Sequence, residues 1–402
     1  MKYFGIILKF LFTSTFYPPF HIGGDANHVK YLAEELAKLG HEVHVFYNRD
    51  AFSIKRRLPP QVMGYQKDVI VHKYESPFNL SPYIVYLLGN SQTITKAFKV
   101  LINKIQPQVV HHHNISLLGY SIINRFGSYA NIYTAHDYWL ICQQNNILRN
   151  GVHECNDDKC ISCALTHRKP PQLWRHCAGF KKTISQLDLI IAPSTYLEKR
   201  LYQQFKIRSL VIQNFAPLPP SQIPKQEYSD YYLFVGALEE HKGIINLLQT
   251  FKKLRSKIDT KLLIVGKGIL ESKIKNYIKH HSLQKSVIFV GDAYNESLYS
   301  LYHGAKALII PSICPENSPL VALEAMSVGT PVIASDKGGL PEIVEKVDKK
   351  LIFQDFIELE NLLSTFSKKP LKSSEIKRIY QKNFSPEAFT EKYMKAILSI
   401  KN

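Results

Sequence analysis

Short apolar runs alternate along nearly the whole chain with longer stretches whose apolar residues recur every three to four positions. The short runs are rich in Val, Ile, Leu, Phe and Tyr at successive positions, as expected for strands buried on both faces of a parallel sheet. The longer stretches have the spacing of amphipathic helices. This alternation predicts an α/β architecture built from β-α-β units. The predicted strands are Lys9–Thr13, Glu42–Phe46, Val69–Lys73, Val109–His112, Ile132–Ala135, Leu189–Ala192, Leu210–Gln213, Tyr232–Val235, Leu262–Val265, Val287–Val290, Ala307–Ile310 and Pro331–Ala334.

A proline-rich stretch divides the predicted strands into two sets. Four prolines lie between positions 214 and 224, and proline disfavours both helix and strand. We therefore predict an N-terminal Rossmann-like domain over residues 1–215, a linker over 216–230 and a C-terminal Rossmann-like domain over 231–385. Residues 386–402 are expected to form an amphipathic helix that packs back toward the N-terminal domain.

Composition narrows the class of protein. The chain has 402 residues, 45% of them apolar and 21% charged, which excludes a disordered or fibrous protein. No apolar run approaches the roughly 20 residues that span a bilayer, and the apolar start lacks the cleavage site of a signal peptide. Lys and Arg exceed Asp and Glu by 51 − 33 = 18. This excess favours anionic partners: nucleotide phosphates, acidic lipid headgroups or nucleic acid.

In the first half, two loops that follow predicted strands carry candidate chemistry. Gly23 and Gly24 precede a helical stretch that ends at Gly40. Amides at such a helix start bind anions and glycine lets a ligand approach the main chain, although a tight turn also needs small residues. His136 and Asp137 follow another strand, at an edge that faces the ligand crevice in parallel sheets. A histidine serving only a local hydrogen bond is the alternative.

In the second half, strand Tyr232–Val235 leads into Gly236 and then Lys242, just before a helical stretch. An ammonium there would reinforce the helix amides against a diphosphate. The alternative is a solvated surface lysine, the usual fate of this residue type. A second glycine turn, at Gly266, follows the next strand and is expected to line the same crevice.

The stretch 311–331 is the most informative. Ser318 is predicted to cap a helix whose first residue is Pro319 and whose end is marked by Gly329. Glu324 lies inside this helix among apolar residues, where a carboxylate is costly unless it is hydrogen-bonded. The two hydroxyls of a ribose would satisfy both of its oxygens. The alternative is a carboxylate bonded within the protein, for example to a lysine. Glu316 stands just outside the helix start.

These residues resemble a known family. Glu316 and Glu324, with seven residues between them, followed by Gly329-Thr-Pro and Gly338-Gly-Leu-Pro-Glu, are similar to the retaining glycosyltransferases of family 4. The resemblance covers nearly the whole chain. It implies the GT-B fold, in which two Rossmann-like domains with parallel sheets face a central cleft that holds a nucleotide sugar. It extends through the stretches 16–19, 23–24, 136–137, 235–238 and 241–243.

The resemblance also implies roles for particular residues. Lys242 would hold the diphosphate, Glu324 the ribose, and Glu316 the hydroxyls of the donor sugar. His136 would lie beside the donor sugar near its anomeric carbon, and Gly24 close to the diphosphate or the acceptor. Thus His136, Lys242 and Glu316 are the expected catalytic residues. Further expected donor contacts are Gly23, Gly236, Gly266, Asn317, Ser318, Pro319 and Leu320.

The chemistry of the leaving group sets the expected mechanism. Nucleoside diphosphate leaves with growing negative charge, which preorganised amides and Lys242 would stabilise. No carboxylate is placed by the sequence as a covalent nucleophile, so the resemblance implies attack by the acceptor on the face that the diphosphate leaves. Many relatives carry arginine where this chain has Ala237. His241 or Lys267 are candidates to replace that charge.

Two further clusters invite a metal interpretation. In the run His111-His112-His113, alternation along a strand places the first and third side chains on one face and the second on the other, which favours a cleft wall over a metal site. Six cysteines without an export signal indicate a reducing compartment. Four of them could hold a structural zinc or remain free thiols. They are Cys142, Cys155, Cys160 and Cys163.

Together these features predict a retaining hexosyltransferase that moves a sugar from a nucleotide-diphosphate sugar to a surface-polysaccharide or glycolipid acceptor, with no required cofactor and no catalytic metal. We expect it in the cytoplasm, where its positive charge would also fit docking on the acidic inner membrane face. The alternatives are a catalytically silent glycan-binding or scaffold subunit, or a nucleotide-sugar epimerase or phosphorylase of the same fold. No nucleic-acid partner is expected, because no aromatic residues interleave the basic ones.

Overall fold

The computed structural model describes residues 6–20, 23–55, 68–149, 153–155, 160–366 and 372–401. They form two compact units. The first comprises residues 1–150, 155–213 and 389–402, and the second comprises residues 151–154 and 214–388.

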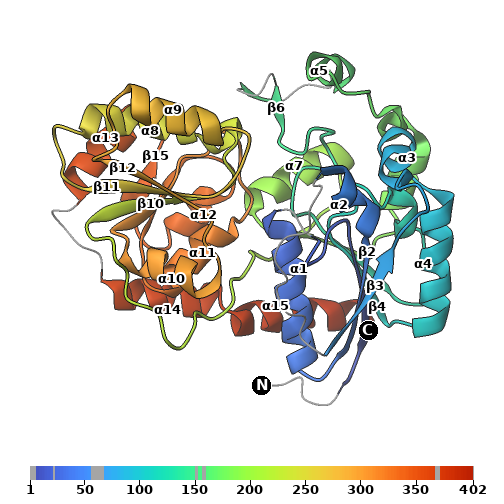
Figure 1. The fold of residues 1–402 in the computed structure, drawn as a ribbon. Helices are drawn as coiled ribbons and strands as arrows, with labels where there is room; N and C mark the ends of the chain where they lie inside the picture. Colours follow the sequence, from blue (N-terminus) through green and yellow to red (C-terminus); the bar gives the residue numbers. More distant parts are fainter. Residues whose placement is uncertain are drawn as a thin grey trace. The chain divides into compact units, whose positions relative to one another are not determined.

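The first unit is built on a parallel sheet in the order β3-β2-β1-β4-β5-β8-β9 (Figure 1). Each central strand is buried along its length because helices cover both faces. Its strands are β1 (Lys9–Ser14), β2 (Glu42–Asn48), β3 (Val69–Tyr74), β4 (Val109–His112), β5 (Ala130–Thr134), β8 (Leu189–Ala192) and β9 (Leu210–Val211), and the short strands β6 (Leu148–Arg149) and β7 (His153–Glu154) lie outside this sheet. Its helices are α1 (Gly24–Lys38), α2 (Arg49–Lys55), α3 (Ser81–Leu88), α4 (Gln92–Ile105), α5 (Cys160–Thr166), α6 (Ala178–Ile184) and α7 (Thr195–Phe205), with 3₁₀ turns η1 (Tyr120–Ile123) and η2 (Leu173–His176).

The second unit repeats this plan with a parallel sheet in the order β12-β11-β10-β13-β14-β15. Its strands are β10 (Tyr231–Val235), β11 (Lys261–Val265), β12 (Val287–Gly291), β13 (Ala307–Ile310), β14 (Val332–Ser335) and β15 (Ile352–Phe353). Its helices are α8 (Ile244–Leu254), α9 (Glu271–His280), α10 (Asn295–Gly304), α11 (Leu320–Ser327), α12 (Leu340–Val344), α13 (Phe356–Thr365) and α14 (Ser373–Asn383), with 3₁₀ turns η3 (Glu240–Lys242) and η4 (Lys349–Leu351).

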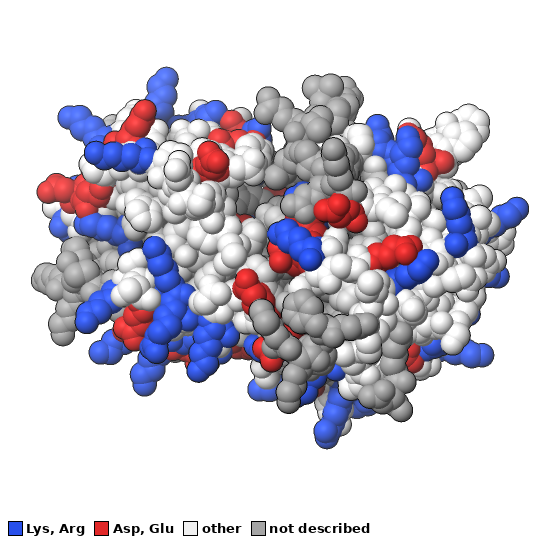
Figure 2. Space-filling view, turned by 90° about the horizontal axis from the view of Figure 1, so that it is seen from below, with Lys and Arg blue, Asp and Glu red and all other residues white. Residues whose placement is uncertain are grey.

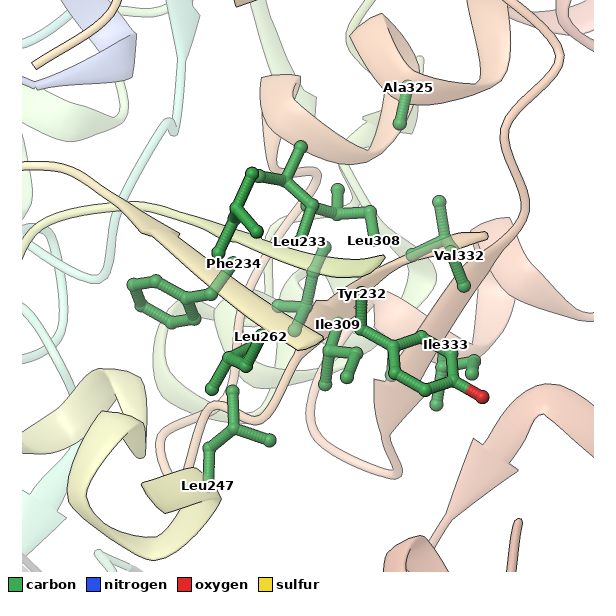
Figure 3. Packing of buried hydrophobic residues seen from close by; sticks show 14 of the residues in the cluster. Tyr232, Leu233, Phe234, Leu247, Leu262, Leu308, Ile309, Ala325, Val332 and Ile333 are labelled. Carbon is green, nitrogen blue, oxygen red and sulfur yellow. The ribbon is translucent and has the colours of Figure 1, made fainter. Parts of the chain in front are cut away.

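The core of the second unit lies on both faces of its sheet. Figure 3 shows side chains of β10, β11, β13 and β14 with Leu247 of α8 and Ala325 of α11. The apolar residues of α8 recur at helical spacing, so one side of the helix is buried. This packing holds the loops at the carboxyl ends of β10 and β13, which carry the candidate site.

The last helix, α15 (Pro386–Lys401), is amphipathic. Its residues from Phe389 onward belong to the first unit. The ring of Tyr393 stacks on His111 with centroids 5.4 Å apart, and Phe389 meets His28 edge-on at 5.4 Å. Among the described residues, no helix is long and apolar enough to cross a membrane.

Every predicted strand is present, and no end differs by more than two residues. The largest differences, of two residues, lie at the end of β2, at the start of β5 and at the end of β9, which stops at Val211. Strand β15 was not predicted because two residues are too short a run for a periodic signal.

Candidate functional site

In the second unit, a lysine and a glutamate meet where β10 and β13 end. Lys242 ends η3, which follows β10, and Glu316 lies in the loop between β13 and α11. The Lys242 Nζ atom is 2.6 Å from Oε1 of Glu316. Ser312 Oγ donates to the same oxygen at 2.7 Å. The lysine and glutamate side chains are only 27% and 13% exposed, so the ion pair is partly shielded from water.

This pairing keeps both groups charged. Burial by itself would lower the pKa of Lys242, but the charge of Glu316 outweighs it and the pKa lies above its usual value. Burial would likewise raise the pKa of Glu316, but the Lys242 charge and hydrogen bonds from Lys242 and Ser312 lower it below its usual value. At neutral pH the site therefore presents one fixed cation beside one fixed anion.

The surrounding loops approach one another through their main chains. The amide of Ile313 donates to the carbonyl of His241 at 2.9 Å. Gly243 has φ +70°, and a Cβ there would lie 1.8 Å from the Pro311 oxygen. Gly266 has φ +141°, and a Cβ there would lie 1.9 Å from the Gly236 oxygen. Glycine is therefore required at both positions for backbone packing.

Glu324 lies on α11, one turn after its start. The hydroxyl of Tyr302 on α10 donates to its Oε2 at 2.9 Å. In the described part of the chain Glu324 forms no ion pair with a lysine or arginine. The protein group that hydrogen-bonds to its carboxylate is the tyrosine hydroxyl. Burial raises the pKa of Glu324, and the Tyr302 hydrogen bond opposes that shift.

The predicted cap of α11 is wrong. The helix begins at Leu320, Pro319 precedes it with extended backbone angles (φ −68°, ψ 127°), and no side chain caps it. Ser318 instead accepts a hydrogen bond from the Asn214 amide at 3.1 Å, and its carbonyl accepts from Asn214 Nδ2 at 2.9 Å. A residue before proline is disfavoured in the helical region, so the chain turns into the helix only after Pro319. Asn317 is also buried in this loop.

Both residues predicted to replace the arginine absent at Ala237 have a carboxylate neighbour. Lys267 forms an ion pair with Asp292. His241 Nδ1 lies 3.3 Å from an oxygen of Glu239. Lys242 is therefore the cation that the structure brings next to the loop before α11.

In the first unit, the predicted glycine junction lies at the start of α1. Gly23 has φ +89° and Gly24 is the first helical residue. The Asp25 carboxylate accepts from the Ala26 amide at 2.9 Å and from Asn114 Nδ2 at 2.6 Å. The chain thus supplies its own anion at this helix start, which sequence reasoning missed.

His136 follows β5 and belongs to a buried cluster of imidazoles. Its Nε2 lies 2.9 Å from Nδ1 of His113, and the two rings stack with centroids 5.2 Å apart. The ring of His28, from α1, meets His136 edge-on at 4.9 Å. Burial lowers the pKa of His136 to about 3 and lowers that of His28 and His113 well below the usual value. These histidines are therefore neutral at physiological pH.

The predicted alternation of the three-histidine run is confirmed. His111 and His113 share a face, with ring centroids 4.0 Å apart. His112 points to the other face, where it bonds with Thr13 and Asn131 at 2.8 and 3.0 Å.

None of the six cysteines is in a disulfide bond. Cys163 Sγ lies 3.7 Å from His167 Nδ1. Over the described ranges, no group of three or more His, Cys, Asp or Glu side chains is arranged to hold a metal ion. A structural zinc at Cys142, Cys155, Cys160 and Cys163 therefore stays a prediction.

Sequence reasoning missed the residues that orient the expected ones. Tyr302, Ser312 and Asn214 belong to no recognised motif, and each contacts its partner only through the packing of helices and loops in the folded unit. His113 could have been predicted from the sequence. It follows β4 and His136 follows β5, and the carboxyl ends of neighbouring parallel strands lie at the same edge of the sheet.

The comparisons with known proteins decide the family. Residues 22–218 match the family model described as Glycosyltransferase Family 4, and residues 220–383 match the one described as Glycosyl transferases group 1. The chain belongs to the family 4 glycosyltransferases. This glycosyltransferase is 27% identical over 344 residues to an uncharacterised glycosyltransferase of Methanocaldococcus jannaschii, a match that covers 82% of this chain and 80% of the relative.

Solved structures establish the fold of the glycosyltransferase. Sucrose-phosphate synthase from Thermosynechococcus elongatus matches with a TM-score of 0.70 at 20% identity, over 98% of this chain and 99% of that one. HepE from Anabaena, solved in complex with UDP and glucose, matches with a TM-score of 0.64 at 16% identity, over 98% and 100%. The two parallel-sheet units are thus the two Rossmann-like domains of the GT-B fold, as predicted.

Proposed function

We propose that this glycosyltransferase is a retaining hexosyltransferase that takes its sugar from a nucleotide-diphosphate sugar. The observation that carries the proposal is the Lys242–Glu316 ion pair at the carboxyl ends of β10 and β13, where ligands of α/β sheets bind, with Glu324 on α11, the helix that follows β13. A structural relative solved with UDP and glucose supports the donor class.

In the proposed donor site each charged group has a separate task. The ammonium of Lys242 neutralises charge on the leaving diphosphate, assisted by the backbone N–H groups of Asn317, Ser318 and Leu320 at the start of α11. Glu316 accepts hydrogen bonds from donor-sugar hydroxyls while it keeps Lys242 charged and oriented. Glu324 accepts from the ribose through its oxygens, one of which is already oriented by Tyr302. Gly236 and Gly266 allow this crevice to form by their close backbone approach.

In the first unit we assign His136 to the donor sugar near the anomeric carbon. Its low pKa makes it a neutral hydrogen-bonding group rather than an acid. Gly23 and Gly24 lie at the start of α1, where the Asp25 carboxylate occupies part of the helix terminus. We therefore assign these glycines to the acceptor side rather than to the diphosphate.

The acceptor is proposed to be a surface glycan or a glycolipid at an acidic membrane face. An exposed apolar face on and before α3, the α3 face, supports this. It comprises Phe78, Leu80, Tyr83, Leu87 and Leu88, of which Phe78 is 79% and Leu88 61% exposed. Contiguous exposed apolar side chains mark interaction sites.

The charge of the surrounding sequence fits an anionic surface. Residues 76–136 contain no Asp or Glu but include Lys96, Lys99, Lys104 and Arg125. On the face shown in Figure 2, lysine and arginine side chains are interspersed with acidic ones. We therefore propose that the α3 face, rather than the net charge alone, locates the enzyme on the lipid surface.

The test uses the full chain with a panel of nucleotide sugars, with and without EDTA. Binding and slow hydrolysis of at least one donor, unchanged by EDTA, is expected, and nuclear magnetic resonance of the product gives its anomeric configuration. Lys242→Gln should abolish turnover, whereas the matched control Lys252→Gln, on the exposed side of α8, should not. Inversion at the anomeric carbon, or no binding to any donor, would contradict the proposal. Binding without turnover would favour the silent scaffold subunit instead.

A further inference from the structure

The histidine that we assign to the donor sugar is hydrogen-bonded to a second histidine of the first unit. His136 follows β5 and His113 follows β4, and these two strands are parallel neighbours. The carboxyl ends of such strands lie at one edge of the sheet. Nδ1 of His113 is 2.9 Å from Nε2 of His136. One ring nitrogen of His136 is therefore engaged by the protein itself.

Close packing fixes the ring of His113. It faces the ring of His111 with centroids 4.0 Å apart, and the ring of Phe12 meets it edge-on at 5.0 Å. Its main-chain amide donates to the carbonyl of Thr13 on β1 at 2.9 Å, and the residue is fully buried. A buried ring among close-packed neighbours cannot turn to another partner without moving them. The contact with His136 is therefore set by the fold.

The ring of His111 is held in turn by two hydroxyl groups. Its Nδ1 lies 2.8 Å from the hydroxyl oxygen of Tyr393 on α15, and its Nε2 lies 2.8 Å from that of Thr134 on β5. Both nitrogens of His111 are thus engaged. It supports the ring of His113 by stacking and does not compete with it for His136.

The second nitrogen of His113 decides where the proton between the two rings lies. Among the described residues, Nε2 of His113 is buried without a hydrogen-bond partner. Burial lowers the pKa of both rings, so each imidazole is neutral at pH 7 and carries one proton. A proton on Nε2 of His113 would bury an N–H group without an acceptor, which folded proteins avoid more strictly than an unused acceptor. The proton of His113 therefore belongs on Nδ1.

We propose that His113 is a positioning residue for sugar transfer, because its Nδ1–H group donates to Nε2 of His136 and fixes that ring in the tautomer protonated on Nδ1. The hydrogen bond at one ring nitrogen sets the proton on the other. His136 then presents a donor and never an acceptor at Nδ1, and this decides which hydrogen bonds the ring can make with a sugar. The inference rests on the proposed placement of His136 beside the donor sugar.

Nitrogen NMR tests the tautomer without any substrate. The full chain, labelled with ¹⁵N in its histidines, should show His136 protonated on Nδ1 and unprotonated on Nε2 at pH 7, with its signals assigned by their loss in His136→Ala. In His113→Leu the ring should also populate the tautomer protonated on Nε2. The control His112→Leu removes an imidazole from the opposite face and should leave the signals of His136 unchanged. Protonation of Nε2 in the unmodified chain would overturn the proposal even if no variant folded, and an unchanged tautomer in His113→Leu would also overturn it.

Two substitutions of nearly equal shape separate positioning from packing. Asparagine places an amide N–H group near the position of the Nδ1–H group of His113, whereas leucine has a similar branched outline without a polar group. A packing role alone would favour His113→Leu, because burying an amide costs more than burying an apolar side chain. A positioning role predicts the reverse order of turnover. We expect His113→Leu to lower kcat at least tenfold and His113→Asn to lower it about threefold or less, with KM for the donor changed less than about twofold in both.

Turnover is measured with the nucleotide sugar that the donor panel identifies, starting with UDP-glucose. In the His136→Ala background, His113→Leu should cause no further loss, because His113 acts through His136. Equal or higher turnover in His113→Leu than in His113→Asn would overturn the positioning role, and so would an additive loss in the double variant. Full turnover in His136→Ala would overturn the placement of His136 and with it the role of His113. Failure of every nucleotide sugar would contradict the proposed function, whereas the tautomer of His136 is decided by NMR alone.

Discussion

The ion pair between Lys242 and Glu316 yields a quantitative prediction. At 2.6 Å and an effective dielectric constant of about 20, the attraction between two unit charges is about 6 kcal/mol. Desolvation of two largely shielded side chains offsets much of it. Removing one partner of such a pair leaves the other charge uncompensated and costs about 3 kcal/mol or more. We therefore expect Lys242→Met and Glu316→Gln each to destabilise the second unit by about 3 kcal/mol.

The double variant separates the ion pair from other effects of each substitution. Removing both charges should cost clearly less than the sum of the two single changes, with a coupling free energy of about 2 kcal/mol. The residual cost reflects a weaker Ser312 hydrogen bond, because the neutral amide oxygen of Glu316→Gln is a poorer acceptor than a carboxylate.

The assay is urea unfolding without donor, followed by far-ultraviolet circular dichroism. The two tryptophans, Trp139 and Trp174, both belong to the first unit, so tryptophan fluorescence serves as an internal control. The circular dichroism transition should shift while the fluorescence transition stays in place. Additive single effects, with coupling below about 0.5 kcal/mol, would refute the reasoning that the two charges stabilise each other.

Glu324→Gln should weaken donor binding at least tenfold without lowering stability at pH 7, and unchanged donor affinity would remove the ribose role. Because burial raises the folded-state pKa of Glu324, its contribution to stability should fall as pH rises above about 4.5. This pH dependence should be absent in the variant. The first unit should lose stability as pH falls from about 6.5 toward 3, since unfolded histidines take up protons that the buried His136, with its pKa of about 3, does not; a fluorescence-detected stability flat over that range would contradict this. Leu87→Ser with Leu88→Ser should reduce flotation with phosphatidylglycerol vesicles severalfold, and Leu210→Ser, on an exposed leucine outside the α3 face, is the matched control. Elemental analysis of the purified chain checks the predicted structural zinc, for which one equivalent is expected, lost on alkylation of the cysteines.

The α/β class and the succession of strands along the chain followed from the sequence alone. A strand buried on both faces must be apolar at nearly every position, and each helix between strands must show one apolar side. Because both requirements are local, the runs from Lys9 to Ser335 could be recognised without knowledge of their partners. The positions of His136 and Lys242 followed for the same reason, since both lie in loops that follow strands and parallel strands end at one edge.

The pairing of side chains could not be obtained in this way. Lys242 and Glu316 are 74 positions apart, and the predictions gave them separate tasks rather than a shared bond. Ser318 satisfied every local rule for a helix cap, yet its hydroxyl accepts from Asn214, because the loop before Pro319 packs against the segment that opens the second unit.

Hydrophobic periodicity and strand ends depend on a few neighbouring residues, so they can be predicted from the sequence. Contacts between distant loops depend on the packing of whole elements, so only the tertiary structure decided them.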